Sequence, residues 1–143
     1  MIDQPAGFKE LEHTADWELL VWAPDLPALF VQAAQGMYAL AGLSVGLGPR
    51  CWRSLDIQAD DPEALLVIFL TELLYFEEDE RLVFDRFKLQ IVKPNHAERY
   101  HLSAILFGAL AASPGKDIKA VTYHKLNIEQ GSRGFEVRIV FDV

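Results

Sequence analysis

The chain has 143 residues, of which 51% are hydrophobic and 24% charged, and its formal net charge is -8. This length and composition are sufficient for a packed core, so we expect one domain spanning residues 1–143 and exclude intrinsic disorder. The negative charge repels a phosphate backbone, so we expect no tight direct binding of nucleic acid. An acidic surface better suits a divalent cation or a protein partner with a basic groove.

The single cysteine, Cys51, has no partner for an internal disulfide or a thiolate zinc site. We interpret it as a packed structural residue in a protein from a reducing compartment. Residues 1–9 lack a basic region followed by an apolar core, and no apolar run is long enough to cross a membrane. We therefore expect a cytoplasmic protein that does not enter a membrane.

The first predicted helix has apolar residues at steps of three and four from Leu26 to Leu40. Asp25 is its expected N-cap, and Gly42 is expected to end it in the left-handed conformation. Gly36, inside the helix, costs about 1 kcal/mol of helix propensity relative to alanine, which indicates that another element packs closely there.

The second predicted helix starts with Asp61 as N-cap and Pro62 at its first position. Apolar residues surround most of it, so we expect it to lie in the core on a sheet. It is followed by the acidic run 77–80, for which two interpretations stay open: a solvated loop and an acidic surface that faces a partner.

The remaining segments alternate between apolar and polar residues, as strands do. They are residues 17–23, 52–58, 87–91, 100–106, 119–130 and 135–143, with a hairpin turn at 131–134. The order of elements predicts an α+β fold: a single two-layer domain with a largely antiparallel sheet and two helices packed on one side.

Several familiar sites are excluded by spacing. Gly115 and Lys116 are similar to the end of a phosphate-binding loop, but the earlier glycine and the following hydroxyl residue are missing. The chain has neither a Gly-x-Ser-x-Gly elbow nor a His-Glu-x-x-His pair. His124 lies in a predicted strand, where a hydrogen-bonded structural histidine is the simplest interpretation.

Candidate cation ligands occur near both ends of the chain. Glu12, His13 and Asp16 lie within five residues at a predicted bend, and Asp142 is followed by the last residue, Val143, with its main-chain carboxylate. If the last strand pairs with the first bend, Asp16, Asp142 and this carboxylate converge, and a hard cation such as Ca²⁺ or Mg²⁺ would relieve their repulsion. The alternative is that both aspartates are ordinary turn or solvated residues.

Four blocks of the sequence resemble the archease family, and together they extend over almost the whole chain. They are Glu12-His13-Thr14-Ala15-Asp16, the helical stretch 65–75, the stretch 118–124 and the closing Phe141-Asp142-Val143. The resemblance implies an accessory protein, not an enzyme, that activates an RtcB-type RNA ligase by promoting its guanylylation and turnover in tRNA splicing and RNA repair. It also implies a divalent metal ion, Ca²⁺ or Mg²⁺/Mn²⁺, at Asp16, Asp142 and Val143.

The same resemblance identifies further functional candidates. Lys119 matches a lysine of the family's strand block, His124 ends that block, and Glu72 matches a buried helix acid. Two features depart from the family pattern: Trp17 after Asp16, and the short segment 109–116 after Gly108. Two alternative functions stay open, a small metal-dependent phosphohydrolase and a general chaperone or modulator of RNA-modifying enzymes.

Overall fold

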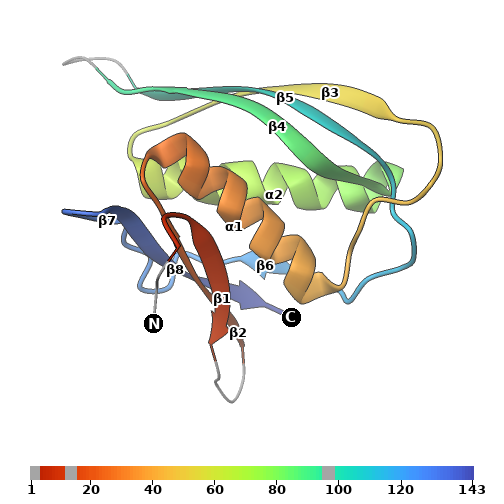
Figure 1. Ribbon diagram of the computed structural model, residues 1–143, viewed down its shortest axis with the longest axis horizontal. Coiled ribbons are helices and arrows are strands. Elements are labelled where there is room, and N and C mark those ends of the chain that lie inside the picture. Colours follow the sequence, from red (N-terminus) through yellow and green to blue (C-terminus); the bar gives the residue numbers. More distant parts are fainter. Residues whose placement is uncertain (1–3, 12–15, 95–98) are drawn as a thin grey trace.

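The computed structural model describes residues 4–11, 16–94 and 99–143. In these ranges the chain forms two helices, α1 (Leu26–Ala41) and α2 (Pro62–Glu80), and eight strands (Figure 1). The strands are β1 (Gly7–Leu11), β2 (Trp17–Ala23), β3 (Cys51–Ala59), β4 (Leu82–Val92), β5 (Tyr100–Leu110), β6 (Ala120–Val121), β7 (Glu129–Gly131) and β8 (Gly134–Asp142).

The strands form two sheets rather than one. The five-stranded sheet has the order β1-β2-β8-β6, with β7 also paired to β8, and the three-stranded sheet has the order β3-β5-β4. Every pairing is antiparallel. The predicted α+β class with largely antiparallel strands is therefore confirmed.

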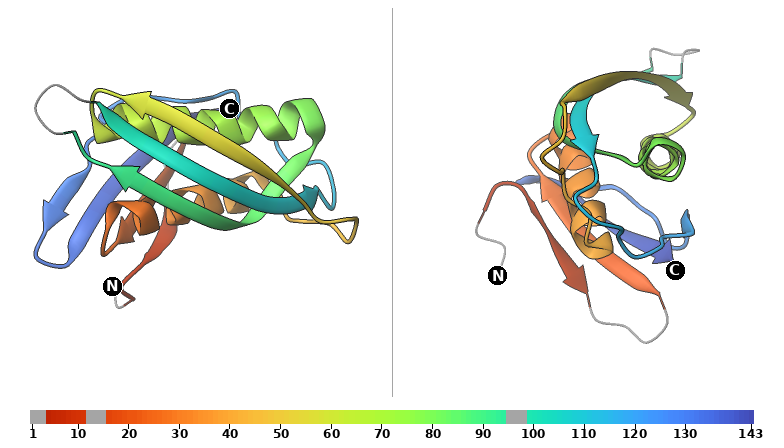
Figure 2. Two further views of the ribbon diagram at one scale, coloured as in Figure 1. Left: turned by 90° about the horizontal axis from the view of Figure 1, so that it is seen from above. Right: turned by 90° about the vertical axis from the view of Figure 1, so that its right-hand side faces the viewer.

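The two helices lie between the two sheets (Figures 1 and 2). Helix α1 packs on β1 and β2 and also touches β4, whereas α2 packs on the three-stranded sheet and reaches β6. The expectation of helices on one side of one sheet thus differs from the structure. The reason is the composition of α2, whose apolar residues surround it and need cover from more than one direction.

Both predicted N-caps are present. The Asp25 carboxylate accepts a hydrogen bond from the backbone N–H of Ala28 at 2.8 Å, and Asp61 accepts one from Ala64 at 2.7 Å. Gly42 ends α1 with φ 68°, in the left-handed region that favours glycine. The helix boundaries therefore follow the local signals that the sequence carries.

The acidic run 77–80 belongs to α2, so the interpretation of this run as a loop was wrong. Arg81, with φ 61°, caps the helix, and its backbone N–H donates to the carbonyl of Glu77 at 2.8 Å. Glu80 forms an ion pair with Arg53 at 2.6 Å, and Glu77 lies 3.4 Å from the guanidinium of Arg81. These arginines offset the unfavourable effect of negative charge at a helix C-terminus.

The predicted strand over residues 119–130 was also wrong in extent, because only β6 and β7 are extended there. Between them the chain turns at Lys125, which has φ 53°, and the N–H of Leu126 donates to the carbonyl of Tyr123. The N–H of Ile128 donates to the Glu63 carboxylate at 2.8 Å instead of to a strand. A side chain of α2 thus takes the place of a strand partner.

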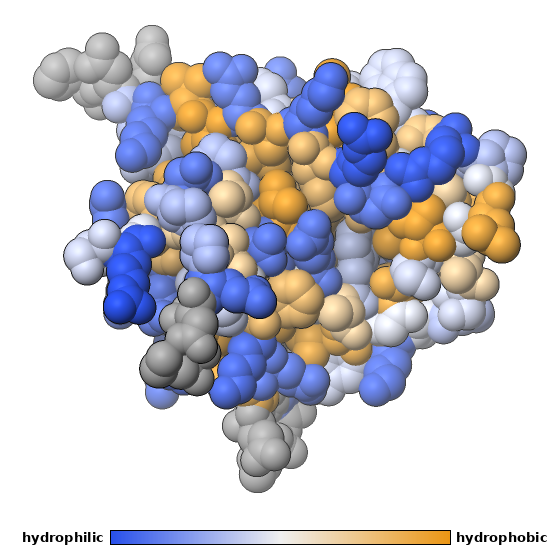
Figure 3. All heavy atoms as spheres, viewed as in Figure 1, coloured by the Kyte–Doolittle hydropathy of each residue, from blue (hydrophilic) through white to orange (hydrophobic). Residues whose placement is uncertain are grey.

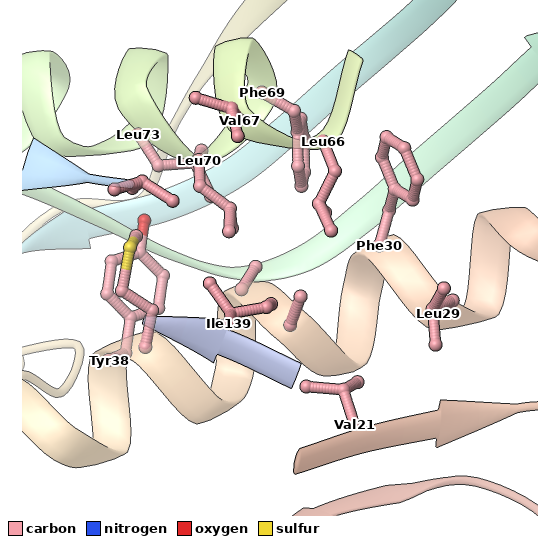
Figure 4. Close-up of a cluster of buried hydrophobic side chains, with 14 of the residues drawn as sticks. Val21, Leu29, Phe30, Tyr38, Leu66, Val67, Phe69, Leu70, Leu73 and Ile139 are labelled. Carbon is pink, nitrogen blue, oxygen red and sulfur yellow. The ribbon is translucent and has the colours of Figure 1, made fainter. Parts of the chain in front are cut away.

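The core is one cluster of buried side chains from both helices and both sheets (Figure 4). Leu66 and Leu70 extend from α2 toward α1 and Ile139 of β8, and the rings of Phe30 and Phe69 lie 5.7 Å apart. The close packing predicted at Gly36 is confirmed, since Leu19 and Phe8 lie directly over it. Neither helix in the described part of the chain is long and apolar enough to cross a membrane.

Candidate functional site

The candidate site lies at the C-terminal end of β8. This strand lies inside the five-stranded sheet, with β2 on one side and β6 on the other. Trp17, the first residue of β2, pairs with Phe141, and Ala120 of β6 pairs with Asp142. The start of β2, the end of β8 and the start of β6 therefore meet at one edge of the molecule, where Figure 1 shows the C-terminus beside β2 and β6.

Asp16 and Asp142 flank a paired position on neighbouring antiparallel strands. Asp16 directly precedes Trp17, and Asp142 directly follows Phe141, so the register of the pair brings the two aspartates opposite each other. Phe141 is fully buried and Trp17 packs against the core, whereas both aspartates are exposed. Because successive side chains alternate between faces, both carboxylates lie on the outer face of the sheet.

Lys119 and Val143 complete this edge. The backbone N–H of Lys119 donates to the carbonyl of Asp142 at 2.8 Å, beside the pair of Ala120 with Asp142, and Val143 directly follows Asp142. Lys119 also lines a pocket of about 390 Å³ between α2 and residues 116–121, together with Tyr75 of α2. The lysine is thus at the boundary between the pocket and the acidic edge.

A second lysine covers the tryptophan of this site. Lys116 Nζ lies 5.4 Å from the ring centroid of Trp17, within the range of a cation–π contact. The backbone N–H of Lys116 donates to the carbonyl of Ala41 at 2.7 Å, which fixes the segment against the end of α1. The segment 109–116 therefore reaches Trp17 through Lys116, its last residue.

Sequence reasoning missed Lys116 and Tyr75 as neighbours of this site. Lys116 reaches Trp17 only because residues 111–119 return past the end of α1, and Tyr75 reaches the pocket only because α2 lies behind β6. Both contacts depend on packing between distant segments, for which the local sequence carries no signal.

The other predicted residues have different outcomes. Glu12 and His13 lie outside the described residues. Glu72 is partly exposed on the side of α2 that carries Ile68 and Tyr75, so the prediction of a buried acid was wrong. His124 is an exposed turn residue, not a residue of a strand, and its N–H donates to the Thr122 hydroxyl at 3.3 Å.

The donor set at this edge has the chemistry of a hard-cation site. Carboxylate oxygens are the ligands that Ca²⁺ and Mg²⁺ prefer, and Asp16 and Asp142 present two carboxylates at this edge. Within residues 4–11, 16–94 and 99–143, no three side chains of His, Cys, Asp and Glu are grouped so as to hold a metal ion. A site here therefore needs the main-chain carboxylate, water molecules or a partner as additional donors.

Fold and site together define a small α+β protein in which two helices lie between two antiparallel sheets, with an acidic edge where the strand β2 begins and β8 ends. The sequence matches the model of the archease protein family (MTH1598/TM1083) over residues 8–143. The chain belongs to the archease family.

Individual relatives agree with this assignment. The archease of Methanosarcina acetivorans is 31% identical over 147 residues, which cover 100% of both chains. The archease of Thermococcus kodakarensis is 32% identical over 127 residues, which cover 86% of this chain and 88% of the relative.

Two solved structures are similar in fold. The solution structure of protein 1598 from Methanobacterium thermoautotrophicum has a TM-score of 0.76 at 26% identity, covering 96% of this chain and 99% of that one. A crystal structure from Thermotoga maritima, described as an archease and possible chaperone, has a TM-score of 0.66 at 18% identity and covers 94% of this chain and 96% of that one.

Proposed function

We propose that this archease is an accessory protein of an RtcB-type RNA ligase. In this role it promotes guanylylation of the ligase and restores its turnover in tRNA splicing and RNA repair, without catalysing a reaction itself. Membership in the archease family supports the general assignment. The observation that carries the proposal is the pairing of Trp17 with Phe141, which makes Asp16 and Asp142 neighbours across two strands.

The acidic edge would hold one divalent cation through Asp16, Asp142 and the carboxylate of Val143. Such a cation, Ca²⁺, Mg²⁺ or Mn²⁺, supplies charge neutralisation when it is bound. Asp142 is the last residue of β8 and Asp16 directly precedes β2, so the pairing of these two strands brings both carboxylates to the same edge. Exposure of both side chains leaves the site open to a partner.

Lys119 would contribute positive charge beside the acidic edge. Its backbone is fixed to Asp142 by the hydrogen bond at 2.8 Å, while its ammonium group is exposed next to the pocket that Tyr75 lines. A lysine in this position suits a phosphate or a carboxylate of the partner complex. We infer that Lys119 orients the partner, whereas the aspartates hold the cation.

A multiple-turnover ligation assay tests the proposal. The purified chain is mixed with an RtcB-type ligase, GTP, Mn²⁺ and RNA ends, and the guanylylated ligase and joined RNA are both measured. We expect stimulation by the unchanged chain and loss of stimulation in Asp16→Asn and Asp142→Asn. The control is Asp79→Asn, which removes an equal charge from an exposed position on α2.

The same assay separates the alternatives. Hydrolysis of a phosphoester by the chain without ligase, lost in Asp142→Asn, would favour the metal-dependent phosphohydrolase. Stimulation that is equal in both aspartate variants and the unchanged chain would favour a general chaperone, the function suggested for the Thermotoga maritima protein. Either result would reject the proposal that the cation links the archease to its ligase.

A further inference from the structure

In the part of the chain that the structure describes, no helix lies over the outer face of the three-stranded sheet. Helix α2 packs on the inner face of β3, β4 and β5, and the left view of Figure 2 looks onto the opposite face, in front of both helices. This outer face is on the far side of α2 from the acidic edge (Figure 1). It is therefore a second surface, separate from the candidate site.

Aromatic and basic side chains form adjacent rows across this face. Trp52 of β3 pairs with Phe107 of β5, which in turn pairs with Arg86 of β4. In the next row Ile105 lies between Ser54 and Lys88. Trp52 is 60% exposed and Ile105 40% exposed, so the apolar centre of the face is open to solvent.

The two cations are directed at the aromatic centre. Arg86 Cζ lies 6.0 Å and Lys88 Nζ 5.9 Å from the ring centroid of Phe107. Among the described residues neither takes part in an ion pair, although two neighbouring arginines do: Arg50 with Asp85 at 2.6 Å and Arg53 with Glu80 at 2.6 Å. The face thus keeps two cations outside ion pairs in a protein whose net charge is -8.

Acidic residues lie at the margin of this face, and each has a basic partner. Asp56, in the row beyond Ile105, contacts His101, and Asp85, at the irregularity of β4 next to Arg86, is bound by Arg50. Among the described residues, the charges in the centre that have no ion-pair partner are therefore positive, and they lie next to the largely exposed ring of Trp52. Figure 3 has the view of Figure 1, with this face at the upper margin, and shows apolar side chains between charged ones on the side toward the viewer.

We propose that this face, with Trp52, Phe107, Arg86 and Lys88 at its centre, binds single-stranded nucleic acid. The unpaired base of a nucleotide stacks on the exposed indole of Trp52, and the phosphates beside it contact Arg86 and Lys88. Aromatic rings and cations on an antiparallel sheet are the elements by which proteins bind single strands with little sequence preference. The proposal does not depend on the ligase, because it concerns a different face of the molecule.

The size and charge of the face indicate a short binding site and a weak interaction. Neighbouring strands are about 4.8 Å apart, so Trp52 and Arg86, two strands apart, span about 10 Å, a distance suited to one or two nucleotides. Two cations on an otherwise acidic protein give weak, salt-sensitive binding. This agrees with the expectation that the chain binds no nucleic acid tightly.

Fluorescence anisotropy with a labelled, non-self-complementary RNA strand at low ionic strength tests the proposal on the full chain. We expect Trp52→Ala to weaken binding about tenfold, the order expected for loss of one stacked base. Arg86→Gln and Lys88→Gln should each weaken binding and reduce the salt dependence by about 0.7 in the log–log slope, as for one lost phosphate contact to a single strand. A duplex of the same sequence should bind more weakly, because its bases are hidden.

Two control substitutions outside the face test whether loss of any exposed ring or any surface cation weakens RNA binding. Tyr123→Ala removes an aromatic ring of similar exposure, 58%, outside the face, and Lys9→Gln removes an exposed cation from β1. Both should bind RNA as the unchanged chain does, and circular dichroism should show that every variant is folded.

Four outcomes would overturn the proposal. The first two are no RNA binding by the unchanged chain and equal binding of duplex and single strand. The others are an equal loss of RNA affinity in Lys9→Gln and Lys88→Gln, and binding of polyglutamate that Trp52→Ala weakens as much as it weakens RNA binding. Sedimentation of the chain alone provides a further test. A dimer that Trp52→Ala dissociates, with no RNA binding, would assign the face to self-association instead.

Discussion

The side chain of Leu19 occupies the space that a β-carbon on Gly36 would need: its Cδ2 atom lies 2.5 Å from that position. Leu19 is 1% exposed and belongs to the core, so the contact limits how closely α1 can approach β2 if residue 36 has a side chain.

Gly36→Ala should therefore destabilise the protein. The substitution gains about 1 kcal/mol of helix propensity, but overpacking of a filled core costs about 1–3 kcal/mol. We expect a net loss in the free energy of unfolding, measured by urea denaturation. Gly48→Ala, at a position with nothing within 4 Å, is the control. A more stable Gly36→Ala protein would show that α1 can shift on the sheet.

The buried hydroxyl of Tyr38 should make stability fall at high pH. Burial raises the pKa of Tyr38, and the hydroxyl accepts a hydrogen bond from the N–H of Phe84 at 3.4 Å. The pKa of Tyr38 is higher in the folded than in the unfolded chain, so the protonated hydroxyl favours the folded state. This stabilisation is complete below about pH 10 and is lost as the pH rises further.

Absorbance titration of tyrosinate, together with urea denaturation between neutral and high pH, measures this effect. In Tyr38→Phe the decrease of stability above about pH 10 should be smaller. Ionisation of all tyrosines at the ordinary pKa in the folded protein would contradict the assignment.

The two N-caps should contribute equally to stability. Asp25→Ala and Asp61→Ala each remove a carboxylate that accepts a helix N–H, at a cost of about 1 kcal/mol. Asp25→Asn and Asp61→Asn keep an acceptor and should cost much less, which distinguishes capping from charge. Thermal denaturation of the four variants measures the difference, and equal losses in Ala and Asn variants would indicate a charge effect instead.

Cations should stabilise the acidic edge only while both aspartates are charged. In the metal-free protein, Asp142→Asn should slightly raise the melting temperature, because like charges opposite each other on adjacent strands repel. Ca²⁺ or Mn²⁺ should then stabilise the unchanged chain but not the variant, since a ligand that binds only the folded state raises its stability. Equal stabilisation of both proteins by the cation would place the binding site elsewhere.

Local signals made the helices and most strands predictable. Asp25, Gly42 and Asp61 mark helix boundaries through contacts within a few residues, so their roles can be inferred from the chain alone. The division into two sheets cannot be inferred in this way, because alternation tells which residues of a strand are buried but not which strand lies beside it. The end of α2 was misjudged for a related reason: Arg53, which lies far from Glu80 in sequence, compensates its charge.

The candidate site was predictable only in part. Alternation placed Asp142 on the polar face of the last strand, and the structure brings Asp16 opposite it through the register of β2 and β8. The positions of Lys116 and Tyr75 beside that edge depend on how a loop and a helix pack, which no local pattern records. Binding of a cation there remains a prediction.

The place of β8 inside the five-stranded sheet has a consequence for synthesis of the protein. Strand β2 near the N-terminus and β6 near the C-terminus each pair with β8, so the sheet has no continuous hydrogen-bonded path until residues 134–142 are made. While the ribosome still holds this segment, the β1–β2 hairpin and α1 lack one of their neighbours, and their apolar side chains stay accessible. Assembly of this half of the molecule must therefore wait until residues 134–142 can pair, and it joins residues that are far apart in sequence, which slows folding.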